Sequence, residues 1–272
     1  MSNKISGSKA LIESMIQEGV DTIFGYPGGA IMPVFDALYD YREKVNHVLV
    51  RHEQGATHAA QGYARTSGKV GVALVTSGPG ATNTVTGIAD AMIDSTPLVV
   101  ISGQVASSLL GSDAFQEADV VGISQPITKW AYQVRRAEDI PWAIARAFYI
   151  ASTGRPGPVL IDITKDAQFG ELDFKYEKIN FIRSYQPIPE VDQNDIKRAA
   201  ELINSAKKPL ALVGQGVILS GAEKELLAFL DKSNVPTALT VLGLSALPSD
   251  HSLNVGMLGM HGRKSSNFVV DD

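Results

Sequence analysis

Short apolar segments alternate with amphipathic helical patterns in the N-terminal part of the chain, and this alternation most constrains its fold. Five segments have the length and composition of buried strands, namely residues 22–24, 48–50, 70–75, 98–101 and 159–163. Helical patterns lie before and between them, near residues 11–16, 30–39, 56–68, 81–92 and 143–151. Strands separated in this way indicate a mainly parallel sheet covered on both faces. We therefore predict an α/β fold with a doubly wound, mainly parallel sheet.

A second, shorter α/β pattern follows residues 166–192, which lack clear periodicity and contain two prolines. In this pattern we expect helices near residues 196–203 and 222–232 and strands near residues 210–213 and 237–241. The predicted organisation is a first domain, a linker and a second domain, at residues 1–168, 169–190 and 191–272. The second domain has few strands for an α/β layer, so we expect it to be incomplete.

Four loops directly follow predicted strands. They are residues 25–29, 51–54, 77–80 and 103–104. Loops that follow parallel strands lie along one edge of the sheet, and ligands of open α/β sheets bind at that edge. We therefore expect the functional site where these four loops converge.

The composition excludes several classes of function. Lys and Arg number 24 against 29 Asp and Glu, and the net charge of −5 argues against a general nucleic-acid binder. The absence of cysteine excludes a disulfide scaffold, a thiolate metal site and a cysteine nucleophile. The long uncharged stretch at residues 70–89 is interrupted by Ser77-Gly78-Pro79-Gly80, so we expect no membrane span. No targeting segment is visible at the N-terminus, and we expect a cytoplasmic protein.

Two glycine-rich motifs partly match the dinucleotide-binding fingerprint. The third glycine is replaced by Asn83 in residues 78–83 and by Leu219 in residues 214–219. Neither motif has a convincing ribose-binding acid about twenty residues later. Tight turns, or an anion at a helix N-terminus, are the open interpretations of both.

Glu53 begins an alanine-rich helix directly after a predicted strand, at the expected site. A glutamate in the first turn usually serves as a partner for the helix dipole. His52 and His58 do not form a zinc-binding pair, because they are six residues apart and point to different faces of the helix. The motifs around Glu53 give this residue a more specific interpretation.

Several motifs together resemble a known family. They are Tyr26-Pro27-Gly28-Gly29-Ala30, Arg51-His52-Glu53-Gln54-Gly55-Ala56, Thr76-Ser77-Gly78-Pro79-Gly80-Ala81-Thr82-Asn83, Asp113-Ala114-Phe115-Gln116-Glu117, Gly154-Arg155-Pro156-Gly157-Pro158-Val159, Asp162-Ile163-Thr164-Lys165-Asp166 and Met257-Leu258-Gly259-Met260-His261-Gly262. The series resembles the pyrimidine-binding domain of thiamine-diphosphate-dependent 2-oxoacid enzymes. The catalytic subunits of acetolactate (acetohydroxyacid) synthases are the most similar among these enzymes.

The resemblance implies catalytic roles for three residues. Glu53 would exchange a proton with a ring nitrogen of the cofactor's aminopyrimidine, so that the cofactor's own amino group can deprotonate the thiazolium. Gln116 would lie near the reacting centre and Lys165 in the substrate channel, whereas the plain alternative for Lys165 is a solvated lysine after a strand. The implied thiamine diphosphate contacts, besides Glu53, are Tyr26, Gly28, Gly29, Ala30, Pro79 and Asn83.

The resemblance also implies a structural FAD. Its contacts would be Arg155, Gly214, Gly216, Thr240, Val241, Leu258, Gly259, Met260 and His261. The plain alternative for Gly214-Gln215-Gly216 is a loop without a ligand.

The family has a further C-terminal domain that binds Mg²⁺ and the diphosphate, and its motif is absent from this chain. We therefore predict no metal ligand here and expect an N-terminal fragment that is inactive alone. The implied transferase reaction condenses pyruvate with a second 2-oxoacid, such as 2-oxobutyrate, in branched-chain amino-acid biosynthesis. The implied assembly is a homodimer or larger oligomer, to which a small regulatory subunit can bind. Two alternatives are another thiamine-diphosphate-dependent decarboxylase or carboligase, and a noncatalytic module that retains the fold.

Overall fold

The computed structural model describes residues 4–271. Residues 1–3 and Asp272 lie outside the described residues. The expectation that the N-terminus carries no targeting segment concerns residues outside this range, as do the outermost residues of the two predicted domains. The chain divides into two compact units, Met1–Pro189 and Glu190–Asp272. None of the helices within the described range is long and apolar enough to span a membrane.

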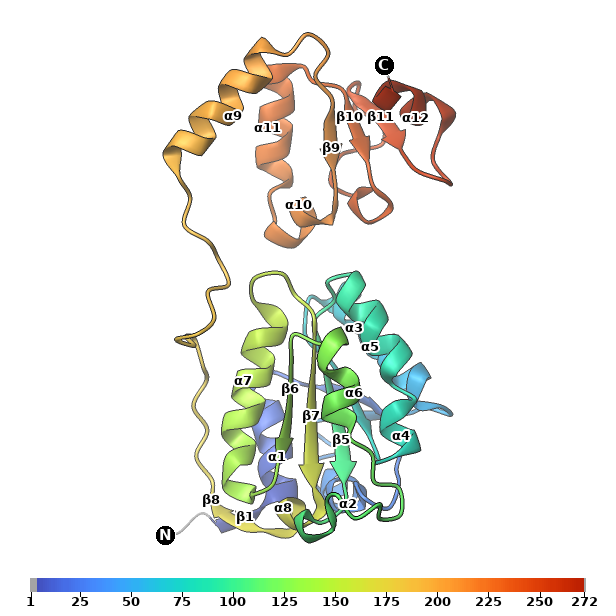
Figure 1. Ribbon diagram of the computed structural model, residues 1–272, viewed down its shortest axis with the longest axis vertical. Coiled ribbons are helices and arrows are strands. Elements are labelled where there is room, and N and C mark those ends of the chain that lie inside the picture. Colours follow the sequence, from blue (N-terminus) through green and yellow to red (C-terminus); the bar gives the residue numbers. More distant parts are fainter. Residues whose placement is uncertain (1–3, 272) are drawn as a thin grey trace. The chain divides into compact units, whose positions relative to one another are not determined.

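Unit 1 is built on a six-stranded sheet in which every neighbouring pair is parallel (Figure 1). The strand order is β3-β2-β4-β5-β7-β6. The strands are β2 (Thr22–Gly25), β3 (Asn46–Leu49), β4 (Gly71–Val75), β5 (Leu98–Gln104), β6 (Trp130–Val134) and β7 (Pro158–Thr164). The prediction of a mainly parallel α/β sheet is confirmed.

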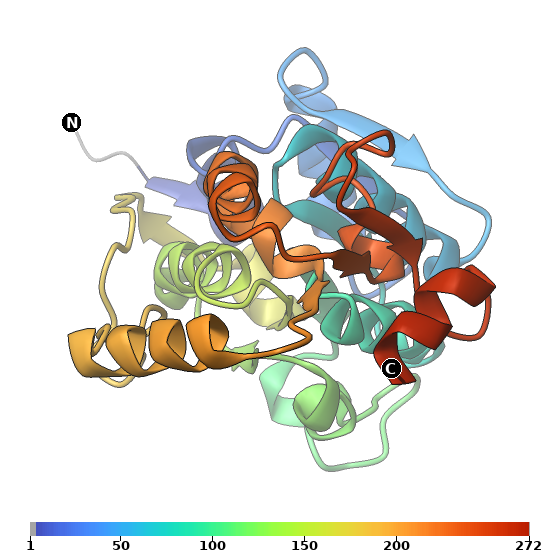
Figure 2. The same cartoon turned by 90° about the horizontal axis from the view of Figure 1, so that it is seen from above.

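Helices cover both faces of this sheet (Figures 1 and 2). One apolar cluster lies among α1 (Gly7–Gln17), α2 (Met32–Asp40) and α7 (Ile140–Ser152). A second cluster lies on the other face, among α3 (Glu53–Ser67), α5 (Val85–Ile93) and α6 (Val120–Ser124). Two separate clusters on one sheet are the signature of a doubly wound fold, as predicted. Every residue of β4, β5 and β7 is buried, which explains their nearly continuous apolar sequences.

Helix α3 shows how the local sequence positions the site. Its N-cap is His52, whose Nδ1 accepts a hydrogen bond from the backbone N–H of Gln54. The small residues Ala56 and Ala60 are fully buried in the apolar cluster on this face, so the helix can lie close to the sheet. Gly68 ends the helix in the left-handed conformation. The start of α3, where Glu53 lies, is therefore fixed by packing as well as by capping.

The structure differs from the sequence prediction in several elements of unit 1. The single helix expected near residues 81–92 is divided into α4 (Pro79–Thr82) and α5. Strand β6 was not predicted, because most of its residues are only half-buried and its apolar pattern is weak. The short helices η1 (Ser107–Leu109), η2 (Gln125–Ile127) and η3 (Ala137–Asp139) complete the unit.

The segment predicted as a linker at residues 169–190 lies almost entirely within unit 1. It begins at the end of α8 (Lys165–Phe169) and contains β8 (Glu171–Asp173). Strand β8 pairs antiparallel with β1 (Lys4–Ser6), a partner about 165 residues away that local periodicity cannot reveal. Ile182, further along the segment, belongs to the apolar cluster of α1 and α7.

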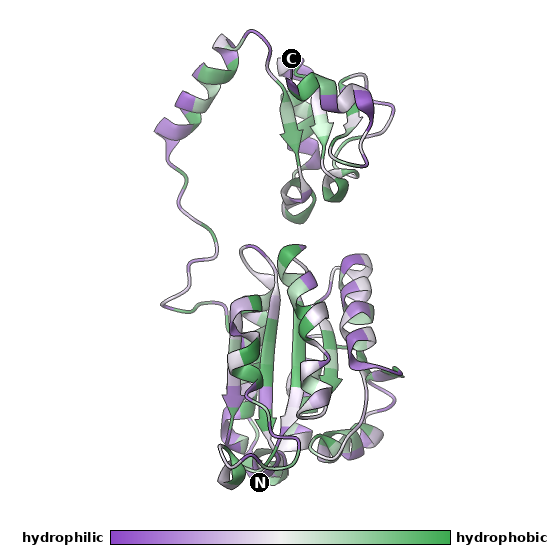
Figure 3. Cartoon of the chain, turned by 45° about the vertical axis from the view of Figure 1, so that its right-hand side comes forward, coloured by the Kyte–Doolittle hydropathy of each residue, from purple (hydrophilic) through white to green (hydrophobic). Residues whose placement is uncertain are grey.

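Unit 2 has a three-stranded parallel sheet in the order β11-β10-β9. The strands are β9 (Ala211–Val213), β10 (Thr237–Leu239) and β11 (Asn254–Met257). Its helices are α9 (Gln193–Ser205), α10 (Gln215–Ser220), α11 (Glu223–Ser233), η4 (Val241–Gly243) and α12 (Lys264–Asp271). Figure 3 shows that α9 carries both hydrophilic and hydrophobic positions, yet none of its residues is buried.

Candidate active site

Glu53 is the central residue of the candidate site in unit 1. It is the first residue of α3, and only 8% of it is exposed. Asn83 donates a hydrogen bond of 2.9 Å from its Nδ2 to Oε2 of Glu53. Among the described residues, none forms a hydrogen bond to Oε1. The structure thus holds one carboxylate oxygen in place and keeps the other available for a ligand.

The predicted cofactor turn, residues 26–30, joins β2 to α2 beside this carboxylate. A Cβ at Gly28 would overlap the side chain of Thr76, and a Cβ at Gly80 would lie 3.3 Å from Oε1 of Glu53. In contrast, a Cβ at Gly29 would meet nothing within 4 Å. The turn is therefore packed against Thr76 at Gly28 and open beside the Cα of Gly29.

Tyr26 and Ala30 complete this turn. Tyr26 is 39% exposed, and its backbone N–H donates to the carbonyl of Leu74 in β4. The N–H of Ala30 donates to Oγ1 of Thr76 over 3.2 Å. The structure therefore brings Tyr26, Gly28, Gly29 and Ala30 together, supported from the ends of neighbouring strands.

Pro79 and Asn83 lie at the two ends of α4. Pro79 is the first residue of this helix, and Asn83 is its C-cap. Gly78 precedes them with a φ of 55°, a conformation that a side chain rarely adopts. The turn at Gly78 has a conformation that favours glycine, and it places the side chain of Asn83 next to that of Glu53.

Gln116 lies against this same turn. It also has a positive φ, of 58°, in the loop between β5 and α6. A Cβ on Gly78 would come within 2.9 Å of the Cα of Gln116, so the two backbones are in direct contact. The side chain of Glu117 stabilises this loop by accepting hydrogen bonds from the backbone N–H groups of Gly111 and Ala114, and these bonds lower the pKa of its carboxyl.

Lys165 begins α8 directly after β7 and is half-buried. Its backbone N–H donates to the carbonyl of Val105, which follows β5. Strands β5 and β7 are neighbours, so Lys165 lies at the same edge of the sheet as the loop that carries Gln116.

Arg155 lies at the opposite edge, because it precedes β7 rather than following it. Its Nε donates to Oγ of Ser95 over 2.7 Å, and its Nη2 donates to the carbonyl oxygens of Met92 and Ile93 at the end of α5. The structure therefore does not bring Arg155 together with Glu53, and it gives Arg155 a structural role at a helix C-terminus.

The predicted residues of unit 2 gather at the carboxyl edge of its own sheet. Gly214, Thr240 and Leu258 directly follow β9, β10 and β11. The N–H of Thr240 donates to the carbonyl of Val213, and that of Leu258 donates to Leu239. The structure thus brings the three loops together, and they contain all the predicted residues of this unit, namely Gly214, Gly216, Thr240, Val241, Leu258, Gly259, Met260 and His261.

Sequence reasoning assigned no individual role to three buried polar residues of unit 1. Thr76 and Gln168 hold the backbone of Ala30. Asp162 accepts hydrogen bonds from Ser102 and, on its other oxygen, from the amides of two glutamines, Gln104 and Gln133. Burial is the largest effect on this carboxyl and raises its pKa to about 6. The available signal was polar residues inside fully buried strands, as in Ser102-Gly103-Gln104.

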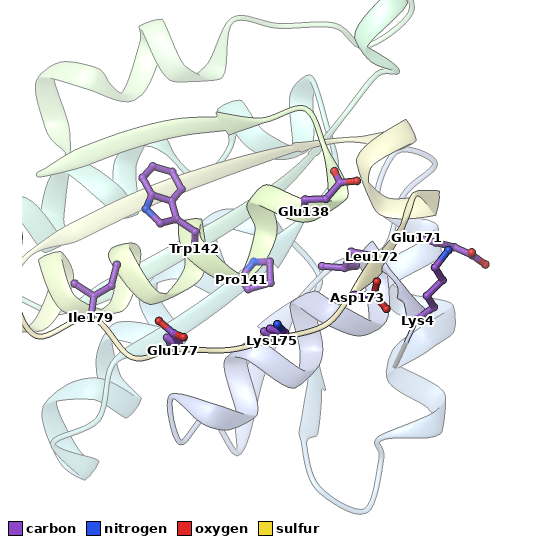
Figure 4. A pocket seen from close by; sticks show the side chains of 10 residues that line it. All are labelled: Lys4, Glu138, Pro141, Trp142, Glu171, Leu172, Asp173, Lys175, Glu177 and Ile179. Atoms are coloured by element: carbon purple, nitrogen blue, oxygen red, sulfur yellow. The ribbon is translucent and has the colours of Figure 1, made fainter. Parts of the chain in front are cut away.

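One surface pocket lies away from this site. It has a volume of about 630 Å³ and is lined by Lys4, Glu138, Pro141, Trp142, Glu171, Leu172, Asp173, Lys175, Glu177 and Ile179 (Figure 4). None of these is a predicted site residue. Within residues 4–271, no cluster of three or more His, Asp or Glu side chains could hold a metal ion.

Two family models match the chain. The N-terminal TPP-binding domain of thiamine pyrophosphate enzymes matches residues 5–123, and the central domain of the same enzymes matches residues 196–272. The first match contains Glu53, Asn83 and the turn at Gly29. The chain therefore belongs to the thiamine pyrophosphate (thiamine diphosphate) enzymes.

Among these enzymes, its relatives are acetolactate synthase large subunits. The chain is 51% identical to that of Buchnera aphidicola (subsp. Schizaphis graminum) over 268 residues, which are 98% of this chain and 47% of the relative. It is 51% identical to that of Corynebacterium glutamicum over 263 residues, 97% of this chain and 42% of the relative. It is 47% identical to the isozyme 3 large subunit of Escherichia coli over 268 residues, 98% of this chain and 46% of that protein. The chain thus spans less than half the length of these relatives.

Proposed function

We propose that this chain supplies the pyrimidine-binding half of an acetolactate synthase active site, as the N-terminal part of a catalytic subunit. In this proposal residues 1–168 form the pyrimidine-binding domain and residues 191–272 form part of the central domain. The observation that carries the proposal is Glu53, a buried carboxylate held by Asn83 beside the open turn at Gly29. The relatives, all acetolactate synthase large subunits, support the choice of reaction.

Thiamine diphosphate, when bound, supplies an electron sink for the carbonyl carbon of a 2-oxoacid. Glu53 exchanges a proton with a ring nitrogen of the aminopyrimidine, and its Oε1 is the available oxygen. Asn83 holds Oε2 and thereby fixes the orientation of the carboxyl group. Tyr26, Gly28, Gly29, Ala30 and Pro79 form the surface against which the pyrimidine lies.

Gln116 and Lys165 act on the substrate side. The ammonium group of Lys165 attracts the carboxylate of pyruvate or of the second 2-oxoacid, such as 2-oxobutyrate. Gln116 is held against Gly78 by a loop that Glu117 stabilises, so its position does not depend on the substrate. The product is acetolactate or acetohydroxybutyrate, a precursor of branched-chain amino acids.

FAD is proposed as a structural ligand of the loops that follow β9, β10 and β11. Gly214 directly follows β9 and Gly216 lies in the first turn of α10, at the edge where these loops meet. The role of Arg155 as an FAD contact stays a prediction from the family resemblance. Mg²⁺ is proposed to bind with the diphosphate on residues outside this chain.

The proposed assembly is a homodimer or larger oligomer in the cytoplasm, with a small regulatory subunit as a further partner. In a shared active site the diphosphate-binding half comes from another subunit. For this reason we expect the isolated chain to have no synthase activity and at best a weak affinity for thiamine diphosphate. Robust acetolactate production by the purified chain would contradict this expectation.

The test uses the intact gene product with pyruvate, thiamine diphosphate and Mg²⁺, with and without FAD. We expect acetolactate to form and the rate to fall at least about tenfold in Glu53→Gln, because an acid–base group is lost. The matched control is Glu223→Gln, which changes the first residue of α11 in unit 2 and leaves the site intact. Turnover of a different 2-oxoacid would favour another thiamine-diphosphate-dependent enzyme, and no turnover at all would favour a noncatalytic module.

A further inference from the structure

Both polar backbone groups of Ala30 are held by buried side chains. Its N–H donates to Oγ1 of Thr76 over 3.2 Å, and its carbonyl accepts a hydrogen bond of 2.8 Å from Nε2 of Gln168. Thr76 is 8% exposed and Gln168 only 1% exposed. These two residues come from the end of β4 and from α8, so two distant elements hold the peptide groups on either side of the Ala30 Cα in the cofactor turn.

The side chain of Gln168 forms hydrogen bonds only through its amide nitrogen, which donates them. Its Nε2 also donates to the carbonyl of Ile163 over 3.0 Å. Its Oε1 is buried and has no hydrogen-bond partner. Burying a hydrogen-bond acceptor without a partner costs free energy of folding. The side chain of Gln168 therefore stabilises the fold through its amide N–H groups.

Gly103 closes the third side of this arrangement. A Cβ at this position would lie 2.5 Å from the carbonyl oxygen of Ala30, so the backbone of β5 abuts the Ala30 peptide directly. We call Thr76, Gly103 and Gln168 together the Ala30 clamp. These contacts from three elements restrict the orientation of both peptide groups that flank the Ala30 Cα.

Helix α8 joins this clamp to the substrate side of the site. Lys165 is its first residue, and Oδ1 of Asp166 accepts a hydrogen bond of 2.9 Å from the N–H of Ser107, at the start of the loop that carries Gln116. Ser8 of α1 donates to the backbone carbonyl of Gln168, which seats α8 on α1. One short helix therefore contacts the turn at residues 26–30, the loop of Gln116 and the strand end of Lys165.

We propose that Gln168 is a positioning residue for the aminopyrimidine of thiamine diphosphate and acts through the peptide of Ala30. This inference rests on the proposed function, because it assigns the pyrimidine to the turn beside Glu53. Thr76 holds the neighbouring peptide, that of the Ala30 N–H, from the side of Glu53. A Cβ built on Gly80 would lie 2.7 Å from Cγ2 of Thr76 and 3.3 Å from Oε1 of Glu53. Gln168 and Thr76 together fix the separation between the turn and the carboxylate.

The test is Gln168→Met in the intact gene product, which removes both donors and nearly conserves the volume. Gln61→Met is the matched control, because Gln61 is 3% exposed, donates its Nε2 to the carbonyl of Gly87 over 3.0 Å and has an unpartnered Oε1. Equilibrium dialysis with Mg²⁺ measures the Kd for thiamine diphosphate, and thermal unfolding measures stability. We expect both variants to lose similar stability, and only Gln168→Met to raise the Kd, by about threefold to tenfold.

The outcomes separate this inference from the proposed function. An unsubstituted protein that binds no thiamine diphosphate refutes the proposed function and this inference with it. A protein that binds it, with an equal Kd in both variants, refutes only the role of Gln168. If Gln168→Met does not fold, Thr76→Val and Thr76→Ser probe the other backbone hydrogen bond of Ala30. We then expect Val, which lacks the acceptor, to raise the Kd above that of Ser, and equal values would overturn the clamp.

Discussion

The candidate binding residues of both units follow parallel strands, but the two sheet edges are held in different ways. In unit 1 side chains from distant elements fasten the loops, as Gln168 does for Ala30 and Asn83 for Glu53. In unit 2 backbone hydrogen bonds such as Thr240 to Val213 connect the strand ends, and side-chain bonds are mostly local. Polar side chains can hold the loops of a sheet edge from distant elements only where the sheet is wide enough to bury those side chains.

The two units also differ in how much apolar surface they bury. Strand β5 of unit 1 is completely buried, whereas Leu212 in β9 is 62% exposed and Ile196 in α9 is 55% exposed. Parallel sheets are normally covered on both faces. The exposed apolar residues of unit 2 agree with the proposal that residues 191–272 are part of a larger central domain.

The largest expected effect tests this difference in burial. Ile101→Ala, in the middle of β5, should destabilise unit 1 by about 4 kcal/mol, because it leaves a cavity at a fully buried position. Leu212→Ala, in β9, should change the stability of unit 2 by less than about 0.5 kcal/mol. Both tryptophans, Trp130 and Trp142, lie in unit 1, so their fluorescence reports its unfolding and circular dichroism reports both units. Equal costs would mean that unit 2 is as tightly packed as unit 1.

The general architecture of both units was predictable from the sequence, because it depends on local patterns. A parallel sheet was predicted from the apolar segments of β4, β5 and β7. The turns after these segments predicted a binding site at the carboxyl edge of the sheet. Glu53 was predicted from its place between a strand and a helix and from the surrounding motifs. These features require no knowledge of which distant residues touch.

The supporting contacts could not be predicted, because they join residues that are far apart in the chain. Gln168 is separated from Ala30 by 138 residues, and Thr76 by 46. The pairing of β1 with β8 was not predicted either, because these strands are also far apart in the chain. A single sequence shows that such residues are polar, but not which partner satisfies them.

A smaller effect concerns Asp162, the buried carboxyl group of unit 1. Burial is the main cause that raises its pKa from 3.8 to about 6, and the nearby charge of Asp119 acts in the same direction. The hydrogen bonds from Ser102, Gln104 and Gln133 act in the opposite direction and lower the pKa. The folded state therefore binds this proton more tightly than the unfolded state. The stabilisation is complete below about pH 4 and is lost as the pH rises through 6, and two pKa units correspond to about 3 kcal/mol.

Urea unfolding followed by tryptophan fluorescence between pH 4 and 7 measures this dependence. We expect Asp162→Asn to remove most of the loss of unit 1 stability over this range, since asparagine does not ionise. Unit 2 should keep the same pH dependence in both proteins, because all the hydrogen-bond partners of Asp162 lie in unit 1. An unchanged slope in the variant would show that Asp162 stays ionised throughout.

The smallest effect compares one helix from each unit. Asp192 caps α9 by accepting a hydrogen bond of 2.8 Å from the N–H of Asn194, and Ser6 caps α1 by accepting one of 3.3 Å from Lys9. Either cap contributes about 1 kcal/mol.

Helix α9 has 13 residues and buries none of them, so its stability depends on local terms that are marginal at this length. Helix α1 buries Leu11, among others, and is stabilised mainly by packing. Asp192→Ala should therefore speed amide hydrogen exchange in α9 several-fold, whereas Ser6→Ala should leave exchange in the middle of α1 unchanged. Equal acceleration in both helices would mean that packing contributes no more to α1 than to α9.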